Sequence, residues 1–210
     1  MNIDILLKYF PKLTADQQRQ YEALYDLYSD WNAKINVISR KDIENLYLHH
    51  VLHSLAIAKA IHFKDNTKIL DFGTGGGFPG IPLAILFPRC QWKLIDGTGK
   101  KIRVATEVAN SIGLKNVVAE HLRGEDEKGM FHFVVSRAVM PLPDLVKIVR
   151  KNISKEQINS MVNGVFCLKG GDVEDEIRPF KNKAEITPIN TWFTEPWFEE
   201  KSVVYLPVCN

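Results

Sequence analysis

Cysteine is scarce in this chain of 210 residues, which contains only Cys90, Cys167 and Cys209. No two of them show the C-x-x-C spacing of zinc or dithiol redox sites, so we expect packing roles in a reducing compartment and no metal site. Long apolar runs are also missing, since the longest, Ile81–Phe87, is far shorter than the roughly 18 residues that a membrane helix needs. The N-terminus lacks the basic and then apolar pattern of a targeting segment. These absences predict a cytoplasmic protein without a membrane partner.

A strong net charge is absent too. Lys and Arg number 27 against 25 Asp and Glu, which gives a net charge of +2 and a pI of about 8.3. Any nucleic-acid surface must therefore be a local patch, because the whole body is not strongly basic. Hydrophobic residues make up 45% and charged residues 25% of the chain, which is typical of one main globular domain with a modest extension.

What the sequence does contain is a glycine-rich segment between two apolar runs. Residues 71–80 read DFGTGGGFPG, which predicts the end of a strand, a tight turn and the start of a helix. Such a turn brings backbone N–H groups close to a nucleotide-like ligand. Its glycines fit two motifs: Gly75, Gly77 and Gly80 match the dinucleotide pattern G-x-G-x-x-G, whereas Asp71, Gly73, Gly75 and Gly77 match the acidic-x-G-x-G-x-G pattern of S-adenosylmethionine (SAM) methyltransferases.

Two carboxylates help to separate these cofactors. Asp96 ends the apolar segment 92–96, 23 residues beyond Gly73, where a strand-end carboxylate reaches the ribose hydroxyls of NAD and SAM alike. A structural Asp at a strand end is the alternative. Asp71 stands directly before the glycines, where it suits a ligand with an ammonium group, such as the methionine part of SAM, and sits poorly beside a pyrophosphate. The segment therefore favours SAM.

The character of the chain changes near residue 66. Before it, apolar and aromatic residues recur at helical spacing behind the capping-box pair Thr14 and Gln17: Tyr21, Leu24, Tyr25, Tyr28 and Trp31. We interpret this stripe as core and not as a base-stacking platform, because an amphipathic helix needs the same spacing. A second helix is predicted from Asp42 to Ile61. The sequence thus predicts an N-terminal helical extension over residues 1–66.

From residue 67 to 210, β-prone and helical segments alternate, which predicts an α/β, Rossmann-like, doubly wound and mostly parallel sheet. Strands are expected at 68–71, 92–96, 117–120, 131–136 and 164–169, with helices near 79–87, 100–112 and 143–149. Two further β-prone runs, 184–189 and 202–206, have no clear helix between them and predict an antiparallel hairpin at a sheet edge. An NAD domain would continue with βαβ repeats, whereas class I SAM-dependent methyltransferases end in such a hairpin.

Several segments together resemble one family. They are Trp31-Asn32-x-x-x-Asn36, His50-x-x-x-Ser54-Leu55, residues 71–84, Asp96-x-x-x-Lys100-Lys101, Ser136-Arg137-Ala138 and Leu168-Lys169-Gly170. From Trp31 to Gly170 the chain resembles the bacterial ribosomal RNA small subunit methyltransferase G family, also called glucose-inhibited division protein B. The run G-F-P-G-I-P-L-A after the SAM glycines, combined with S-R-A, is specific to that family. The resemblance implies a seven-stranded class I enzyme that uses SAM to methylate N7 of guanine 527 in the 530 loop of 16S rRNA, with the small ribosomal subunit as partner.

The resemblance also implies SAM contacts, which fall on Gly73, Phe78, Gly124, Glu125 and Arg137, with Asp96 in the ribose place. With the motif residues, the expected cofactor set is Asp71, Gly73, Gly75, Gly77, Phe78, Asp96, Gly124, Glu125 and Arg137. Gly124 and Glu125 follow the third predicted strand, where an N–H group and a carboxylate can read the adenine edge. Arg137 follows the fourth strand, at the edge where open α/β folds bind ligands. It can pair with the SAM carboxylate, steer RNA phosphate, or form a surface salt bridge.

Two positions depart from the family pattern, which usually has an acidic residue in place of His53 and Ser in place of Gly97. The first departure weakens any claim that the N-terminal helices touch the active site. His49 and His53, four residues apart, have the spacing of metal ligands, but no third ligand is visible. We expect a solvated or helix-capping histidine pair.

No catalytic side chain is expected beyond a positioning role for Arg137. Residues 136–141 read SRAVMP where amine methyltransferases carry an Asn/Asp/Ser-Pro-Pro-aromatic clamp, and no Cys lies near an expected catalytic turn. Guanine N7 carries a free lone pair, so the enzyme mainly has to align N7 with the SAM methyl group. A positively charged mouth for RNA is expected from Lys100, Lys101, Arg103, Arg123, Arg137 and Lys169.

Two alternatives stay open. An NAD-dependent short-chain oxidoreductase would share the turn and Asp96, but it relies on Tyr-x-x-x-Lys, and no tyrosine here has a lysine four residues later. A non-catalytic ribosome-associated protein could keep the methyltransferase fold, although the intact Asp71 and Asp96 argue against it. No sequence feature specifies the oligomeric state, for which we expect a monomer, or the assembly state of the RNA substrate.

Overall fold

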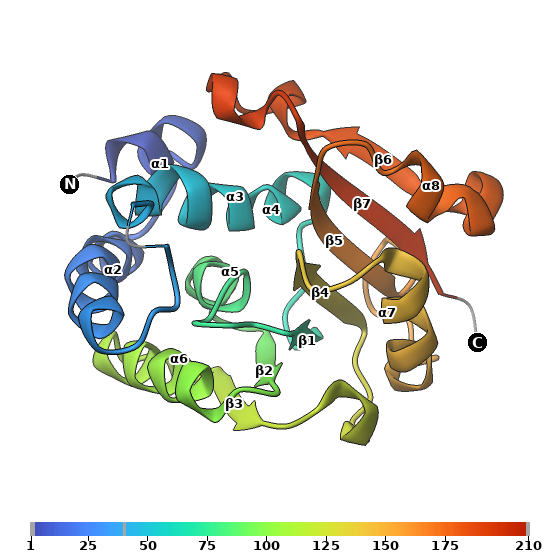
Figure 1. The fold of residues 1–210 in the computed structure, drawn as a ribbon, viewed down its shortest axis with the longest axis horizontal. Helices are drawn as coiled ribbons and strands as arrows, with labels where there is room; N and C mark the ends of the chain where they lie inside the picture. The colour runs from blue at the N-terminus through green and yellow to red at the C-terminus, as the bar shows by residue number, and fades with distance from the viewer. Residues whose placement is uncertain (1–2, 40, 209–210) are drawn as a thin grey trace.

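The computed structural model describes residues 3–39 and 41–208, which are built around one sheet of seven strands (Figure 1). The strands are β1 (Lys68–Phe72), β2 (Gln91–Asp96), β3 (Val117–His121), β4 (Phe133–Arg137), β5 (Gly164–Gly170), β6 (Glu185–Pro188) and β7 (Lys201–Pro207). Their order across the sheet is β3-β2-β1-β4-β5-β7-β6. The first five are parallel, and β7 runs antiparallel to both β5 and β6. The predicted mostly parallel sheet with a C-terminal antiparallel pair is confirmed.

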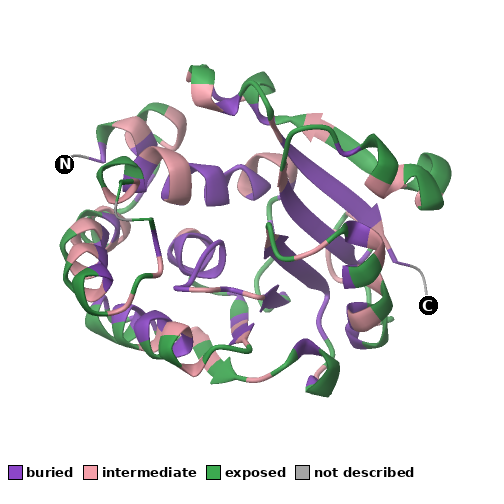
Figure 2. Cartoon of the chain, in the orientation of Figure 1, coloured by how far each residue is buried: buried purple, intermediate pink, exposed green. Residues whose placement is uncertain are grey.

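Successive residues of the central strands face opposite sides of the sheet, as strand geometry requires. Ile69 of β1 belongs to one buried cluster and Leu70 to the other, and Phe133 and Val134 of β4 divide in the same way. Both faces are therefore covered, which explains the consecutive apolar residues at 69–70 in β1 and 133–135 in β4. Figure 2 shows β5 and β7 buried along most of their length, whereas β3 at the sheet edge is largely exposed.

Helices cover both faces. On the first face lie α1 (Asp4–Tyr9), α2 (Ala15–Lys34), α3 (His53–Leu55), α4 (Ile57–Ala60), α5 (Gly80–Leu86) and α6 (Gly99–Ser111), and on the second lie α7 (Leu142–Val149) and α8 (Glu174–Ile177). The short turns η3 (Gly124–Asp126), η4 (Arg150–Asn152), η5 (Arg178–Lys183), η6 (Ile189–Thr191) and η7 (Pro196–Phe198) connect the later elements. α2 packs on α5 and α6, which brings the N-terminal helices onto the helix that follows the glycine turn.

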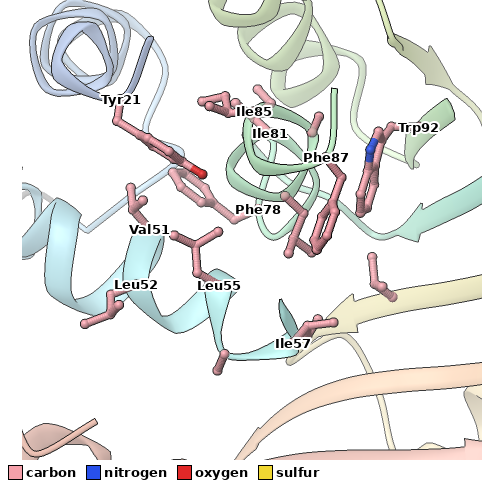
Figure 3. Close-up of a cluster of buried hydrophobic side chains, with 14 of the residues drawn as sticks. Tyr21, Val51, Leu52, Leu55, Ile57, Phe78, Ile81, Ile85, Phe87 and Trp92 are labelled. Carbon is pink, nitrogen blue, oxygen red and sulfur yellow. The ribbon is translucent and has the colours of Figure 1, made fainter. Parts of the chain in front are cut away.

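The predicted N-terminal helices form, with one difference. Thr14 and Gln17 make the reciprocal capping box at the start of α2, and Tyr21 and Tyr28 are fully buried as predicted. The predicted helix 42–61 is instead divided into the 3-10 turn η1 (Ile43–Asn45), the π-helix η2 (Leu46–Leu52), α3 and α4. Figure 3 shows Val51 and Leu55 of this segment converging with Ile81 and Ile85 of α5.

The segment between β6 and β7 crosses the sheet edge to reach α1. Phe193 is fully buried, with its ring centroid 4.7 Å from that of Tyr9 and 5.1 Å from that of Phe198. Glu195 accepts hydrogen bonds from Lys8 at 2.8 Å and from the Tyr9 hydroxyl. The chain's first helix and its last connection therefore share one apolar core. The division into an extension over 1–66 and a methyltransferase domain over 67–210 stays a prediction.

Two of the three cysteines pack inside the fold. Cys90 and Cys167 are free and buried, and burial raises the pKa of their thiols to about 11 and about 12. The predicted packing role is confirmed for both, while Cys209 lies outside the described residues. Across ranges 3–39 and 41–208, no helix combines the length and apolar character that a membrane crossing needs.

The shared core predicts a large loss of stability on truncation of Phe193. Phe193→Ala removes a fully buried ring and leaves a cavity, so the free energy of unfolding should fall by about 3 to 5 kcal/mol in urea denaturation. Ile186→Ala on the exposed side of β6 is the control and should cost about 1 kcal/mol or less. Equal effects of the two substitutions would show that the C-terminal connection is not part of this core.

Candidate active site

The turn between β1 and α5 takes its shape from glycines and from Asp71. Gly73, Gly75 and Gly77 have φ angles of +69°, +58° and +114°, in the region where other residues are strained. Asp71 Oδ2 accepts hydrogen bonds from Thr74 Oγ1 at 2.5 Å and from the Gly80 amide at 2.7 Å. Gly80 begins α5, so a free N–H group at the helix start is satisfied by the chain's own carboxylate. A pyrophosphate would have to compete with that carboxylate.

Asp71 itself lies beneath the turn and is fully buried. Burial raises the pKa of its carboxyl to about 7, although the hydrogen bonds from Thr74 and Gly80 act in the opposite direction. Its second oxygen, Oδ1, has no hydrogen-bond partner among the described residues. The direct contact with a ligand ammonium group that the sequence suggested stays a prediction. The contacts present show Asp71 holding the turn in place.

Asp96 braces the same turn from the end of β2. Its Oδ2 accepts from the Gly75 amide at 2.9 Å, and its Oδ1 accepts from the Thr98 amide at 2.8 Å. Each carboxylate oxygen can accept a second hydrogen bond. Because the half-buried side chain also lines a cleft, Asp96 still presents acceptors to a ligand there.

This cleft, of about 420 Å³, lies at the carboxyl ends of the parallel strands. Its walls come from the last residues of β1 and β2 and from the segments that follow β1, β2, β3 and β4: Phe72, Gly73, Ile95, Asp96, Gly97, Thr98, Leu122, Arg123, Gly124, Glu125, Val139 and Met140. Four predicted cofactor residues thus meet in one cavity of a size typical for small ligands. Of the others, Gly75 contacts Asp96 from the turn, whereas Asp71, Gly77 and Phe78 are buried behind it.

Glycine is required at two walls of the cleft by close approach. A Cβ atom at Gly124 would lie 1.9 Å from Phe72 Cε2, and one at Gly73 would lie 2.5 Å from Val139 Cγ2. At Gly97, where the family usually has Ser, a Cβ atom would meet nothing within 4 Å, so this departure has no steric cause. Sequence reasoning did not identify Thr98, Val139 or Met140 as cleft residues. Their positions just after predicted strands were the available signal.

The other side of the turn is occupied by Phe78 and Arg137. The Arg137 guanidinium carbon lies 5.0 Å from the centroid of the buried Phe78 ring. Burial lowers the pKa of Arg137 to about 10 while the Asp71 charge opposes this, so the guanidinium stays charged at neutral pH. Tyr28 of α2 packs on Phe78 at 4.8 Å and donates its hydroxyl to the Gly76 carbonyl at 2.9 Å. The N-terminal helices therefore touch the turn, despite the departure at His53.

The predicted solvated or helix-capping pair of His49 and His53 is wrong. The His49 ring stacks on Trp197 at 4.2 Å, and His53 is only 6% exposed, edge-on to the same indole at 5.1 Å. Trp197 belongs to η7, in the connection between β6 and β7. The spacing of His49 and His53 in the sequence could not show that a residue so far along the chain packs on them. Within the described part of the chain, no three His, Cys, Asp or Glu side chains gather as metal ligands would.

Most of the predicted RNA-contacting residues stand at the same edge of the molecule. Lys100 and Arg103 are exposed on α6, Lys101 beside them is half-buried, and Arg123 is exposed at the cleft. Lys169 differs, because its amine is bound inside the fold. It donates to Glu176 at 2.6 Å and to the Met140 carbonyl at 2.9 Å, with its side chain 10% exposed. Its RNA contact stays a prediction, and its visible partners fix the segment after β4.

Comparison with known proteins identifies a family. Residues 17–201 match the family model described as rRNA small subunit methyltransferase G. "Ribosomal RNA small subunit methyltransferase G" of Bacteroides thetaiotaomicron is 66% identical over 97% of this chain and 98% of that protein. The protein of the same name from Porphyromonas gingivalis is 55% identical over 98% of this chain and 93% of its own length.

Solved structures share the fold at low sequence identity. A SAM-dependent methyltransferase from Aquifex aeolicus superposes with a TM-score of 0.58 at 16% identity, over 82% of this chain and all of that one. A variant of MtNAS in complex with S-adenosylmethionine gives a TM-score of 0.58 at 11% identity, over 92% of this chain and 76% of that one. The sheet is thus the class I SAM-dependent methyltransferase fold, and the chain belongs to the rRNA small subunit methyltransferase G family.

Proposed function

We propose that this chain transfers a methyl group from SAM to N7 of guanine 527 in the 530 loop of 16S rRNA, with the small ribosomal subunit as its partner. The observation that carries the proposal is the cleft in which Gly73, Asp96, Gly124 and Glu125 meet, in a chain of this family. When bound, SAM supplies an electrophilic methyl group, which N7 takes with its lone pair as the bond from carbon to sulfur breaks.

The residues of the cleft hold and orient the reactants. Asp96 accepts from the ribose hydroxyls, and Gly124 and Glu125 face the adenine edge. Arg137, on the far side of the turn, binds the methionine carboxylate or an RNA phosphate. No residue has to remove a proton, because N7 of a neutral guanine has a free lone pair, so alignment is the main catalytic contribution.

Competing chemistry finds little support among the described residues. Methylation at cytosine C5 needs a reactive thiolate, whereas Cys90 and Cys167 are buried with raised pKa values. The NAD alternative would place a pyrophosphate at the start of α5, where the Asp71 carboxylate already binds Gly80. The non-catalytic alternative is weakened by the complete cleft, which a protein without turnover would not need.

Removing the Asp96 carboxylate should weaken SAM binding. Asp96→Ala loses charge-assisted hydrogen bonds to the ribose and the brace on Gly75, which together cost on the order of 1.5 to 3 kcal/mol, or roughly ten- to a hundredfold in affinity. Calorimetry with S-adenosylhomocysteine measures this, with Asp96→Asn as the variant that keeps the shape. Asp144 is an exposed residue of α7, so Asp144→Ala should leave the affinity for S-adenosylhomocysteine unchanged. Unchanged affinity in folded Asp96 variants would remove Asp96 from the ribose site.

The basic edge should affect RNA binding without affecting SAM. Lys100→Ala combined with Lys101→Ala should lower affinity for the small subunit and flatten its dependence on salt by about one log unit per lost phosphate contact. SAM affinity should stay within roughly twofold. The matched control is Lys68→Ala with Lys115→Ala, which removes the same charge at the opposite edge of the sheet. An equal loss in the control would show a general charge effect and no local RNA surface.

The reaction itself can be mapped to one atom. With SAM and small subunits from cells that lack this protein, the chain should place one methyl group on guanine N7, detected by borohydride reduction and aniline cleavage. At saturating SAM the rate should vary little between about pH 6 and 9, because the step needs no general base. Saturation matters because the Asp71 carboxyl, with its pKa near 7, titrates in this range in the free chain. Transfer to an adenine amine or a cytosine carbon would contradict the proposal.

A further inference from the structure

A carboxylate outside the SAM cleft is held by two consecutive histidines. Asp42 Oδ1 lies 2.5 Å from His49 Nδ1, and Asp42 Oδ2 lies 2.8 Å from His50 Nε2. An ionised carboxylate only accepts hydrogen bonds, so both ring nitrogens donate. Partial burial acts to raise the pKa of Asp42, but the bonds from the two histidines outweigh it and hold that pKa below its usual range. Asp42 is therefore a fixed negative charge at neutral pH.

Each histidine is fixed in turn by an aromatic ring from a distant segment. His49 stacks on Trp197 with the ring planes 14° apart, and the His50 ring lies 5.4 Å from that of Phe78. Burial and the nearby Arg137 charge lower the pKa of His50 to about 4, so this ring is neutral at pH 7. The position of Asp42 is thus set by the glycine-rich turn between β1 and α5 on one side and by the β6–β7 connection on the other.

The position of Asp42 relative to the turn suggests what it faces. Phe78 directly follows the SAM glycines, and the Asp42 charge acts on Arg137, which lies over the Phe78 ring. Phe78, Arg137 and Asp42 are not among the residues that line the cleft with Asp96. A base that receives a methyl group from the cleft and contacts Asp42 has to lie between the cleft and this group of side chains.

Asp42 is also the most accessible member of its group. Its side chain is 31% exposed, against 17% for His49 and 14% for His50. Asp42 Oδ2 uses one acceptor position on His50 and keeps another for a ligand. Oδ1 accepts from His49 and, at 3.3 Å, from the exposed side-chain amide of Asn45, a long hydrogen bond that a ligand donor can replace.

Guanine offers the matching chemistry. Its Watson–Crick edge carries two neighbouring donors, N1–H and the N2 amine, and proteins read unstacked RNA bases on that edge. Adenine presents a bare N1 acceptor there, which a carboxylate repels. N7 lies on the Hoogsteen edge and not on the Watson–Crick edge, so a carboxylate that binds the Watson–Crick edge leaves N7 free to face the cleft. The ring gains positive charge as N7 is methylated, which a nearby fixed anion stabilises.

We propose that Asp42 binds the N1–H and N2 amine of the target guanine, and so selects guanine and positions its N7. His49 and His50 act as positioning residues that hold the carboxylate. The inference rests on the proposed function, because it concerns the base that this function modifies.

The test pairs a substitution in the protein with a deletion in the base. Small subunits are reconstituted with 16S rRNA that carries either guanine or inosine at the target position, since inosine lacks only the N2 amine. For the wild-type chain, inosine should lower kcat/KM roughly tenfold or more. Asp42→Ala should lower kcat/KM on guanine by a similar or larger factor. In that variant, replacing guanine by inosine should lower kcat/KM by less than about threefold, because the carboxylate that binds the N2 amine is already gone.

Controls separate recognition from folding. Affinity of Asp42→Ala for S-adenosylhomocysteine should stay within roughly twofold of the wild-type value. If that variant does not fold, Asp42→Asn replaces it in the same comparison of guanine and inosine, and the loss of kcat/KM on inosine should again be smaller than for the wild-type chain. Asp65, which precedes β1, is an exposed carboxylate that pairs with Arg89. Asp65→Ala should leave kcat/KM unchanged on both guanine and inosine.

The outcomes distinguish this inference from the proposed function. If the wild-type chain methylates guanine but the full inosine penalty persists in the Asp42 variants, Asp42 only fixes its histidines and the inference is overturned. The absence of an inosine penalty in the wild-type chain would overturn it as well. If the wild-type chain transfers no methyl group to any of these subunits, the proposed function itself fails, and the inference fails with it.

Discussion

The buried carboxylate of Asp71 is the contact on which the rest of the site depends. It joins the side chain of Thr74 to the amide of Gly80, and so fixes both ends of a turn whose glycines adopt left-handed backbone angles. Asp96 holds the same turn from β2 through the Gly75 amide. Phe78 directly follows the glycines of this turn, and Arg137 and His50 pack against its ring.

The two sides of the turn are built by different parts of the chain. The cleft side comes from the carboxyl ends of strands of the sheet and the segments that follow them, which places it at the edge where open α/β folds bind ligands. The other side is built from α2, the π-helix η2 and the β6–β7 connection, with Tyr28, His49 and Trp197 as its contacts to the core. The sheet therefore supplies the cleft that we propose for the cofactor, and the added segments supply the side on which we propose that the target base binds.

Short sequence patterns predicted much of the fold and part of the cleft. The strands followed from apolar runs bounded by turn residues, the start of α2 followed from Thr14 and Gln17, and the spacing of Asp96 from the glycines located a carboxylate that does line the cleft. The expectation that was wrong depends on a contact between segments far apart in the chain, because His49 and His53 are covered by Trp197. The hydrogen bonds from Lys169 to Glu176 and Met140 were not foreseen either, and the RNA contact of Lys169 stays a prediction. The hydrogen bonds of Asp71 were also missed, because the motif shows its place beside the glycines but not the direction of its side chain.

The central claim is that the cleft between Gly73, Asp96 and Gly124 is where SAM binds and from which the methyl group is delivered. A crystal structure of the chain with S-adenosylhomocysteine tests it most directly. We expect the ribose hydroxyls within hydrogen-bond distance of Asp96, the adenine beside Gly124 and Glu125, and the sulfur at the turn on the side that faces Phe78. A nucleoside bound elsewhere, or a sulfur turned away from Phe78 and Arg137, would contradict it.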